Sequence, residues 1–165
     1  MNEKISSLGF HRKGKEFMEA AFAVKEPDGS NPLLDSAPFV AYYLLGHAME
    51  LYLKSFLIGR GMTEKELRFK PYGHDLRELL IEARRRKLGR ELKLSNRDLN
   101  VVCLLNSHYK PKHLEYYAKG LYSFPPYSII ADVVKRSCNS VHTYASQVTD
   151  SEFQKTQKRR YNQSE

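Results

Sequence analysis

The stretch AYYLLGHAMELYLKSFL, residues 41–57, decides the fold of this 165-residue chain. Its large apolar side chains recur every three or four residues, which is the spacing of an α-helix. Asp35 or Ser36 is expected to cap this helix, with Pro38 in its first turn, and Gly59 is expected to end it. Because the helix is apolar around most of its circumference, other helices should surround it.

Outward from this segment, the same periodicity predicts four more helices. They are expected at about residues 10–25, 75–88, 95–110 and 125–150. A short helical turn is expected to begin at Thr63, because Thr63 and Glu66 have capping-box spacing, and Asp75 should cap the helix after it. The sequence therefore predicts an all-α, up-and-down bundle of about five helices over residues 1–150. A basic, disordered tail is expected over residues 151–165.

Two finer expectations concern burial inside this bundle. In the first helix, an apolar face is predicted from Phe17, Ala20, Ala21 and Val24. The only two cysteines, Cys103 and Cys138, lie in apolar helical stretches, so both are expected to be buried free thiols.

The cellular setting is also an expectation from the sequence. Free thiols fit a reducing compartment, and the N-terminus lacks the apolar segment of a secretory signal. The longest apolar stretch, 39–58, carries three ionisable residues, which a lipid-facing helix rarely does. These features predict a soluble, cytoplasmic protein without a membrane partner.

Positive charge is concentrated in one segment of a chain whose net charge is +8. Residues 84–97 contain a single acidic residue, Glu91, against seven basic ones. The basic residues are Arg84, Arg85, Arg86, Lys87, Arg90, Lys93 and Arg97. Such a cluster is typical of a protein that binds a polyanion such as RNA. The alternative is a solvated helix end, where cations are favoured by the helix dipole.

The central helix carries one polar stripe, formed by Tyr43, His47, Glu50 and Lys54. Glu50 and Lys54 have the spacing and order of a favourable ion pair. A histidine beside a carboxylate also suits a general base or half of a metal site, whereas a polar seam between helices is the structural alternative. No second set of ligands and no phosphate loop or dinucleotide motif accompanies the stripe, so no metal and no cofactor is expected.

The last helix contains Arg136 and, six positions later, His142. Six residues correspond to about 9 Å of rise and about 120° of rotation, so the two side chains do not meet on one helix. Two copies of the helix at a two-fold axis would bring them together. Cleavage of RNA needs these two types, an imidazole that moves protons and a guanidinium that stabilises the charged phosphate.

Several segments together resemble the HEPN family of helical domains. They are LGHAMELYLK (45–54), GHDL (73–76), LNSHY (105–109), LEY (114–116), and Arg136 followed by His142 and Tyr144. The resemblance covers residues 10–148. It implies a helical bundle, often homodimeric, whose active members are metal-independent ribonucleases in toxin–antitoxin or phage-defence systems. It also implies an antitoxin or a small nucleotidyltransferase as a partner.

The resemblance assigns roles to individual residues. Arg136 and His142 would be catalytic, with Asn139 and Tyr144 supporting them, and the stripe His47, Glu50 and Lys54 would support the bundle or line the cleft. Ser137 stands where catalytic members usually carry Asn or Asp.

RNA binding and a non-catalytic alternative both remain open from the sequence. The basic residues of 84–97 would attract RNA, and Tyr116, Tyr117 and Tyr122 would stack on bases or else anchor their loop. The alternative to a ribonuclease is a non-catalytic module that binds a protein partner or a nucleotide-like ligand.

Overall fold

The computed structural model describes residues 5–24, 38–116 and 122–162, which form six α-helices and one 3₁₀ turn, with no strand among them. The helices are α1 (Ser7–Ala23), α2 (Phe39–Gly59), α3 (Glu64–Arg68), α4 (Leu76–Arg85), α5 (Asn96–Tyr109) and α6 (Tyr127–Asn162), and the 3₁₀ turn is η1 (Leu88–Arg90). The predicted all-α bundle is confirmed. Five helices correspond to the expected ones, and α3 is the short turn predicted at Thr63.

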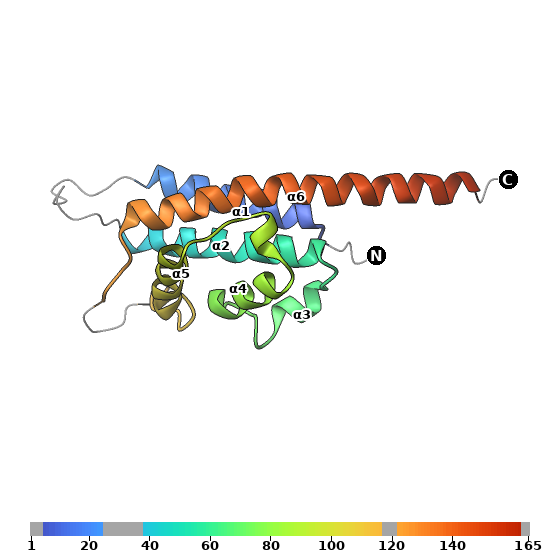
Figure 1. Cartoon of the computed structure of the whole chain (residues 1–165). Helices are drawn as coiled ribbons and strands as arrows, with labels where there is room; N and C mark the ends of the chain where they lie inside the picture. Colours follow the sequence, from blue (N-terminus) through green and yellow to red (C-terminus); the bar gives the residue numbers. More distant parts are fainter. Residues whose placement is uncertain (1–4, 25–37, 117–121, 163–165) are drawn as a thin grey trace.

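Helix α2 is the centre of the bundle. Helices α1, α4, α5 and α6 all pack against it, and α5 also contacts α6. Helix α4 lies across α2 from α6 (Figure 1). Fourteen of its 21 residues are buried, a proportion that requires neighbours on every side. The largest buried side chains of the core come from this helix, among them Tyr42, Met49, Tyr52 and Phe56.

Side-chain caps begin the helices around α2. Thr63 and Glu66 form the predicted capping box of α3, and Ser95 and Asp98 form another at α5. Asp75 caps α4 by accepting hydrogen bonds from the backbone N–H groups of the second and third helical residues. These local signals, all readable in the sequence, fix the directions in which α3, α4 and α5 leave their turns.

The start of α2 differs from the expectation. Pro38 is its N-cap residue and makes no side-chain cap hydrogen bond, so it lies just before the first turn rather than in it. Asp35 and Ser36, the expected caps, lie outside the described residues.

The predicted apolar face of α1 is confirmed only in part, because Ala21 is buried and Phe17 packs partly buried against the core. Ala20 is exposed and Val24 is the half-buried C-cap, whereas Gly14 and Met18 are buried. The cause is a close approach of α2, because a Cβ added at Gly14 would lie 2.8 Å from Cε1 of Tyr52. Contact with α2 therefore sets which side of α1 faces inward.

The cysteine prediction holds for one residue only. Cys138 is buried in α6, but Cys103 is exposed on α5. Helix α5 instead turns Val101, Val102 and Leu105 toward the core, which leaves Cys103 on the outer side.

The tail was also expected to be disordered from Ser151, but α6 continues as a helix to Asn162 and extends beyond the bundle (Figure 1). Residues 151–159 are exposed, so their helical conformation comes from local sequence rather than from packing. They include Glu152, Gln154, Lys155, Gln157 and Lys158, which are good helix formers. Among the described residues, no helix combines the length and apolarity needed to cross a bilayer.

Candidate functional site

The polar stripe of α2 meets the ends of α4 and α5 in a compact group, the Glu50 cluster (Glu50, Lys54, His47, His74 and Tyr109). Glu50 is only 2% exposed, and its carboxylate accepts hydrogen bonds from three side chains. Lys54 Nζ lies 2.6 Å from Oε1, the Tyr109 hydroxyl lies 2.6 Å from Oε2, and His74 Nδ1 lies 2.9 Å from Oε2. The predicted Glu50–Lys54 ion pair is present.

The hydrogen bonds of this cluster determine which ring nitrogens carry protons. A carboxylate accepts only, so the Tyr109 hydroxyl donates its single proton to Glu50. His47 Nδ1, 2.9 Å from the Tyr109 oxygen, must then be the donor in that contact. His74 Nδ1 likewise donates to Glu50. In both rings the remaining nitrogen is Nε2.

The charge state follows from burial and from these contacts. Burial by itself raises the pKa of Glu50, but the ammonium of Lys54 and the hydrogen bonds from its neighbours outweigh that effect, so the pKa lies below its usual value. Burial and the Glu50 carboxylate raise the pKa of Tyr109, which keeps its proton. Burial lowers the pKa of His47, so its ring is neutral at neutral pH.

Local backbone features place these side chains. Gly46 leaves room for Tyr109, because a Cβ there would lie 2.7 Å from Cδ2 of the tyrosine ring. The turn before α4 is tied to α5, since Asp75 binds Lys110 Nζ at 2.6 Å and the amide of Asn106 at 2.9 Å. His74 precedes Asp75 directly and is thereby held beside Glu50.

His74 and Tyr109 were not among the predicted site residues. His74 binds Glu50 from the turn before α4. The sequence did carry one signal for His74: it directly precedes the cap Asp75, and neither the turn nor the cap requires a histidine there. Tyr109 ends α5, and its meeting with α2 depends on helix packing that no local pattern shows.

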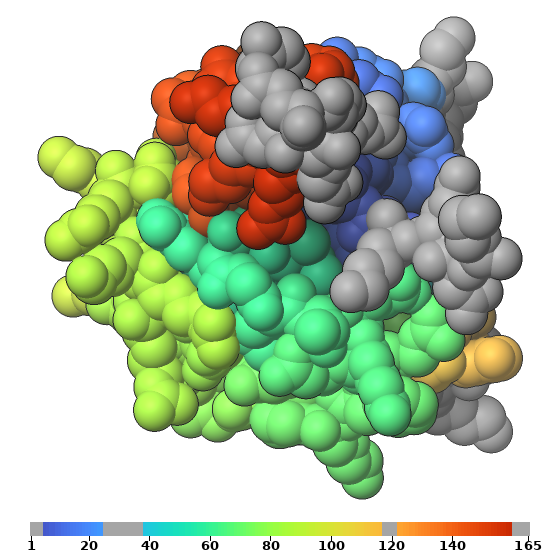
Figure 2. Space-filling view, turned by 90° about the vertical axis from the view of Figure 1, so that its right-hand side faces the viewer, coloured from blue at the N-terminus to red at the C-terminus, as the bar shows by residue number. Residues whose placement is uncertain are grey.

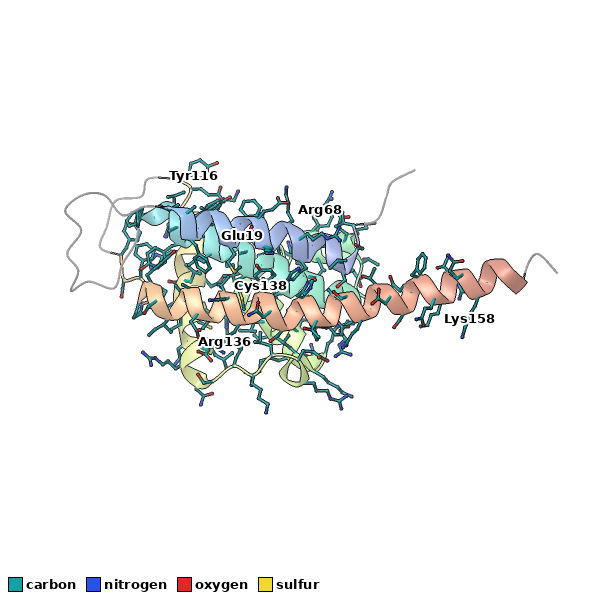
Figure 3. The ribbon with its side chains drawn as sticks, turned by 90° about the horizontal axis from the view of Figure 1, so that it is seen from above. Glu19, Arg68, Tyr116, Arg136, Cys138 and Lys158 are labelled. Carbon is teal, nitrogen blue, oxygen red and sulfur yellow. The ribbon has the colours of Figure 1, made fainter. Side chains whose placement is uncertain are left out.

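The predicted catalytic residues of α6 lie apart. Arg136 pairs with Asp132 at 2.7 Å and with Asp98 of α5 at 2.9 Å, and it also donates to the backbone oxygen of Lys93. In Figure 3 it points from α6 toward the segment that contains α5. The hydrogen bond to Asp132, with a further one to Asp98, raises the pKa of Arg136.

His142 is exposed and faces a different neighbour. Its ring lies 4.9 Å from that of His11 on α1, centroid to centroid. His11 is buried, with Nε2 2.9 Å from the carbonyl oxygen of Cys138, and burial lowers its pKa. Within one chain, therefore, Arg136 and His142 do not share a site.

The two supporting residues predicted on α6 are also separate from one another. Asn139 is exposed, whereas Tyr144 is buried against Phe56 and Arg60 and lies close over Gly59. Tyr144 packs the end of α2 rather than facing a ligand.

The basic residues of 84–97, called the basic segment, run from the end of α4 through η1 to the start of α5. Arg85 and Arg86 both pair with Glu82. The other five basic side chains are exposed, and none pairs with a carboxylate of the described residues: Arg84, Lys87, Arg90, Lys93 and Arg97. Figure 2 shows this yellow-green segment projecting beside α6.

The loop tyrosines differ in their surroundings. Tyr116 is largely exposed. Tyr122 lies against Phe39, His108 and Phe124, as expected for a loop anchor. Tyr117 lies outside the described residues.

No group of three or more His, Cys, Asp or Glu side chains in the described part of the chain is arranged to hold a metal ion. Comparison with protein-family models, with curated proteins and with solved structures finds no match to this chain. The Glu50 cluster, the residues Arg136 and His142 of α6, and the basic segment are the three candidate sites in the described part of the chain.

Proposed function

We propose that this protein is an RNA-binding helical domain that holds the phosphodiester backbone on the basic segment. The observation that carries the proposal is the set of five exposed cations that lack a carboxylate partner among the described residues. Cations of this kind displace counterions from a nucleic acid, and that release drives binding. The resemblance to HEPN domains supports RNA as the polyanion.

The alternative of a solvated helix end accounts for only part of this charge. Arg84 and Arg85 lie in the last turn of α4, where the helix dipole favours them. Lys87, Arg90 and Lys93 follow that helix, and Arg97 lies in the first turn of α5, where the dipole disfavours a cation. The dipole of α4 thus accounts for Arg84 and Arg85, and Arg86 is held by Glu82. Four cations are left for a bound polyanion: Lys87, Arg90, Lys93 and Arg97.

RNA binding is tested by fluorescence anisotropy with a labelled single-stranded RNA. The variant Arg90→Ala/Lys93→Ala should weaken binding and reduce the slope of log affinity against log salt by about one for each lost contact. Lys13→Ala/Lys15→Ala on α1 is the charge-matched control, because these exposed lysines pair with Glu16 and Glu19. Equal weakening in both variants would show that only net charge matters and would refute the proposed surface.

Cleavage by Arg136 and His142 is the catalytic form of this proposal. It requires a second copy of the chain and release of Arg136 from Asp98 and Asp132. The two carboxylates compensate the positive charge of the guanidinium and occupy its N–H donors, so the paired side chain stabilises a phosphate poorly. Such a ribonuclease would belong to a toxin–antitoxin or defence pair. Its test is cleavage in EDTA, which both Arg136→Ala and His142→Ala should abolish in a dimeric protein.

The second candidate is a non-catalytic module that binds a protein partner, such as an antitoxin or a nucleotidyltransferase. The double ion pair of Arg136 favours it over catalysis at that residue. A folded dimer that binds RNA without cleaving it would support this candidate.

A further inference from the structure

Two imidazoles of the Glu50 cluster converge on a single oxygen. Glu50 Oε2 lies 2.9 Å from His74 Nδ1 and 3.9 Å from His47 Nδ1, and Tyr109 bridges to the more distant ring. A carboxylate behind the Nδ1–H of a histidine fixes the orientation of the ring and directs Nε2 outward. Glu50 holds the ring of His74, in the turn before α4, directly in this way. It holds the ring of His47, on α2, through the Tyr109 hydroxyl.

Both imidazole rings reach the surface. The His74 side chain is 56% exposed and that of His47 is 21% exposed. Neither Nε2 makes a hydrogen bond to a described residue, and the Nε2 of His47 is not among the buried side-chain atoms that lack a partner. Both are therefore open to a ligand from solvent.

The stability of the fold does not by itself require the hydrogen bond from His74 to Glu50. Lys54 already neutralises Glu50, and Tyr109 already donates to Oε2. A hydrogen bond from a mostly exposed histidine adds little to stability. What it does provide is a fixed orientation for a ring that faces solvent.

We propose that the Glu50 cluster is an acid–base site, in which His47 and His74 transfer protons during cleavage of a bound RNA strand. This inference rests on the proposed RNA-binding function and assigns the chemistry to residues other than Arg136 and His142.

The exposed face of α4 connects this site to the basic segment. Arg77, Ile81, Arg84 and Arg85 are spaced by four, seven and eight residues, so they lie on one face, and all four are exposed. The helix is about 15 Å long, with His74 just before its first residue and the basic segment at its end. A strand held by the basic segment can follow this face to His74.

The reaction is balanced without a metal or a co-reactant. His47 Nε2 accepts the proton of a ribose 2′-hydroxyl, and the 2′-oxygen forms a bond to phosphorus. The bond from phosphorus to the 5′-oxygen breaks, and a proton from protonated His74 Nε2 goes to that leaving oxygen. The products are a 2′,3′-cyclic phosphate and a 5′-hydroxyl end. After the step, His47 is protonated and His74 is neutral. His47, the more buried ring, suits the base because it is neutral.

The test measures cleavage and binding of a fluorescent single-stranded RNA by the full chain in EDTA. His74→Gln retains an amide that can donate to Glu50 but cannot transfer a proton. It should bind RNA as the wild type does and cleave it about 100-fold or more slowly, the contribution typical of acid–base catalysis. His113→Ala, at an exposed histidine outside the cluster, is the matched control and should cleave normally. The wild-type products should carry cyclic phosphate ends.

The outcomes separate this inference from the proposed function. RNA binding without cleavage, or undiminished cleavage by His74→Gln, would overturn the acid–base site and leave RNA binding intact. Cleavage that His142→Ala abolishes and His74→Gln does not would move the chemistry to α6. An absence of RNA binding would overturn the proposed function and this inference with it.

Discussion

Two ion pairs of this protein have nearly the same geometry and opposite surroundings. In α2, Lys54 binds Glu50 at 2.6 Å, and in α6, Arg136 binds Asp132 at 2.7 Å, each across four residues with the acid first. The carboxylate of Glu50 is 2% exposed, whereas that of Asp132 is 61% exposed. Since water weakens the second pair and not the first, identical sequence spacing conceals very different energetics.

The histidines near the two pairs differ in the same way. Around Glu50, rings from α2 and from the turn before α4 converge on one oxygen. On α6, Arg136 turns to α5 and His142 turns to α1. Polar residues form a site where neighbouring helices meet around them, and the spacing along a single helix does not show whether that happens.

The largest expected effect breaks the buried pair. Glu50→Ala leaves the Lys54 ammonium buried without a counter-charge, so the free energy of unfolding should fall by about 3–5 kcal/mol. Asp132→Ala, the exposed counterpart, should cost about 1 kcal/mol or less. Urea unfolding followed by circular dichroism measures both. Similar losses in the two variants would show that burial does not separate the pairs.

A double variant checks the cause of that loss. Glu50→Gln/Lys54→Met removes both charges, and it should be more stable than Glu50→Ala because no unpaired charge stays buried. An equal loss in the double variant would attribute the effect to the hydrogen bonds of Tyr109 and His74 instead.

Displacing Tyr109 should have the next largest effect. Gly46→Ala places a Cβ 2.7 Å from the tyrosine ring, and such overpacking costs about 1–3 kcal/mol. Gly89→Ala is the control, because nothing lies within 4 Å of a Cβ at that position, and it should be nearly neutral. The same unfolding experiment applies. A neutral Gly46→Ala would mean that the ring moves aside freely and that the cluster is loosely held.

A smaller effect is expected on the α6 side. Arg136→Ala removes the ion pair to Asp98, which keeps its hydrogen bonds to Ser95 at the start of α5. The arginine side chain is 38% exposed, so the loss should be about 1 kcal/mol. The urea midpoint measures this loss of stability. A loss as large as that of Glu50→Ala would show that the ion pairs of Arg136 stabilise the fold as much as the buried Glu50–Lys54 pair does.

The smallest expected effect is on the titration of His11. Burial lowers its pKa from the usual 6.5, and the backbone hydrogen bond to Cys138 opposes this. The nearby ring of His142, and after it Lys15 and Arg12, lower it further. His142→Ala should therefore raise the pKa of His11, as measured by an NMR titration of its ring protons. An unchanged or lower pKa would show that the two imidazoles do not interact.

The lowered pKa of His11 also makes the stability of the fold depend on pH. Because the folded pKa of His11 is below its unfolded value, the unfolded chain takes up the proton first as the pH falls below about 6.5. Stability should therefore decline on acidification through this range, and less so in His142→Ala. Glu50 acts in the same direction at lower pH, because its pKa in the folded chain is below its usual value. Its ionised carboxylate stabilises the fold at pH values above the usual pKa, and this stabilisation is lost as the pH falls through the lowered pKa.

Several elements of the fold were readable in advance because local interactions determine them. The caps at Thr63, Asp75 and Ser95 use side chains and backbone groups only two or three residues apart. The continuous apolar surface of α2 indicated a central helix before any contact was known. By contrast, the inward face of α1 depends on how closely Tyr52 approaches Gly14, which is a contact between helices.

The sequence by itself determined the helical class, the central place of α2, the Glu50–Lys54 pair and the concentration of charge in the basic segment. Each of these follows from residue type and short-range spacing, since helical periodicity and capping act over a few residues. Only the tertiary structure decided that His74 and Tyr109 join Glu50 and that Arg136 is held by Asp98. The physical reason is that such meetings depend on the packing of helices far apart in the chain, and packing is selected by the shape of the whole core.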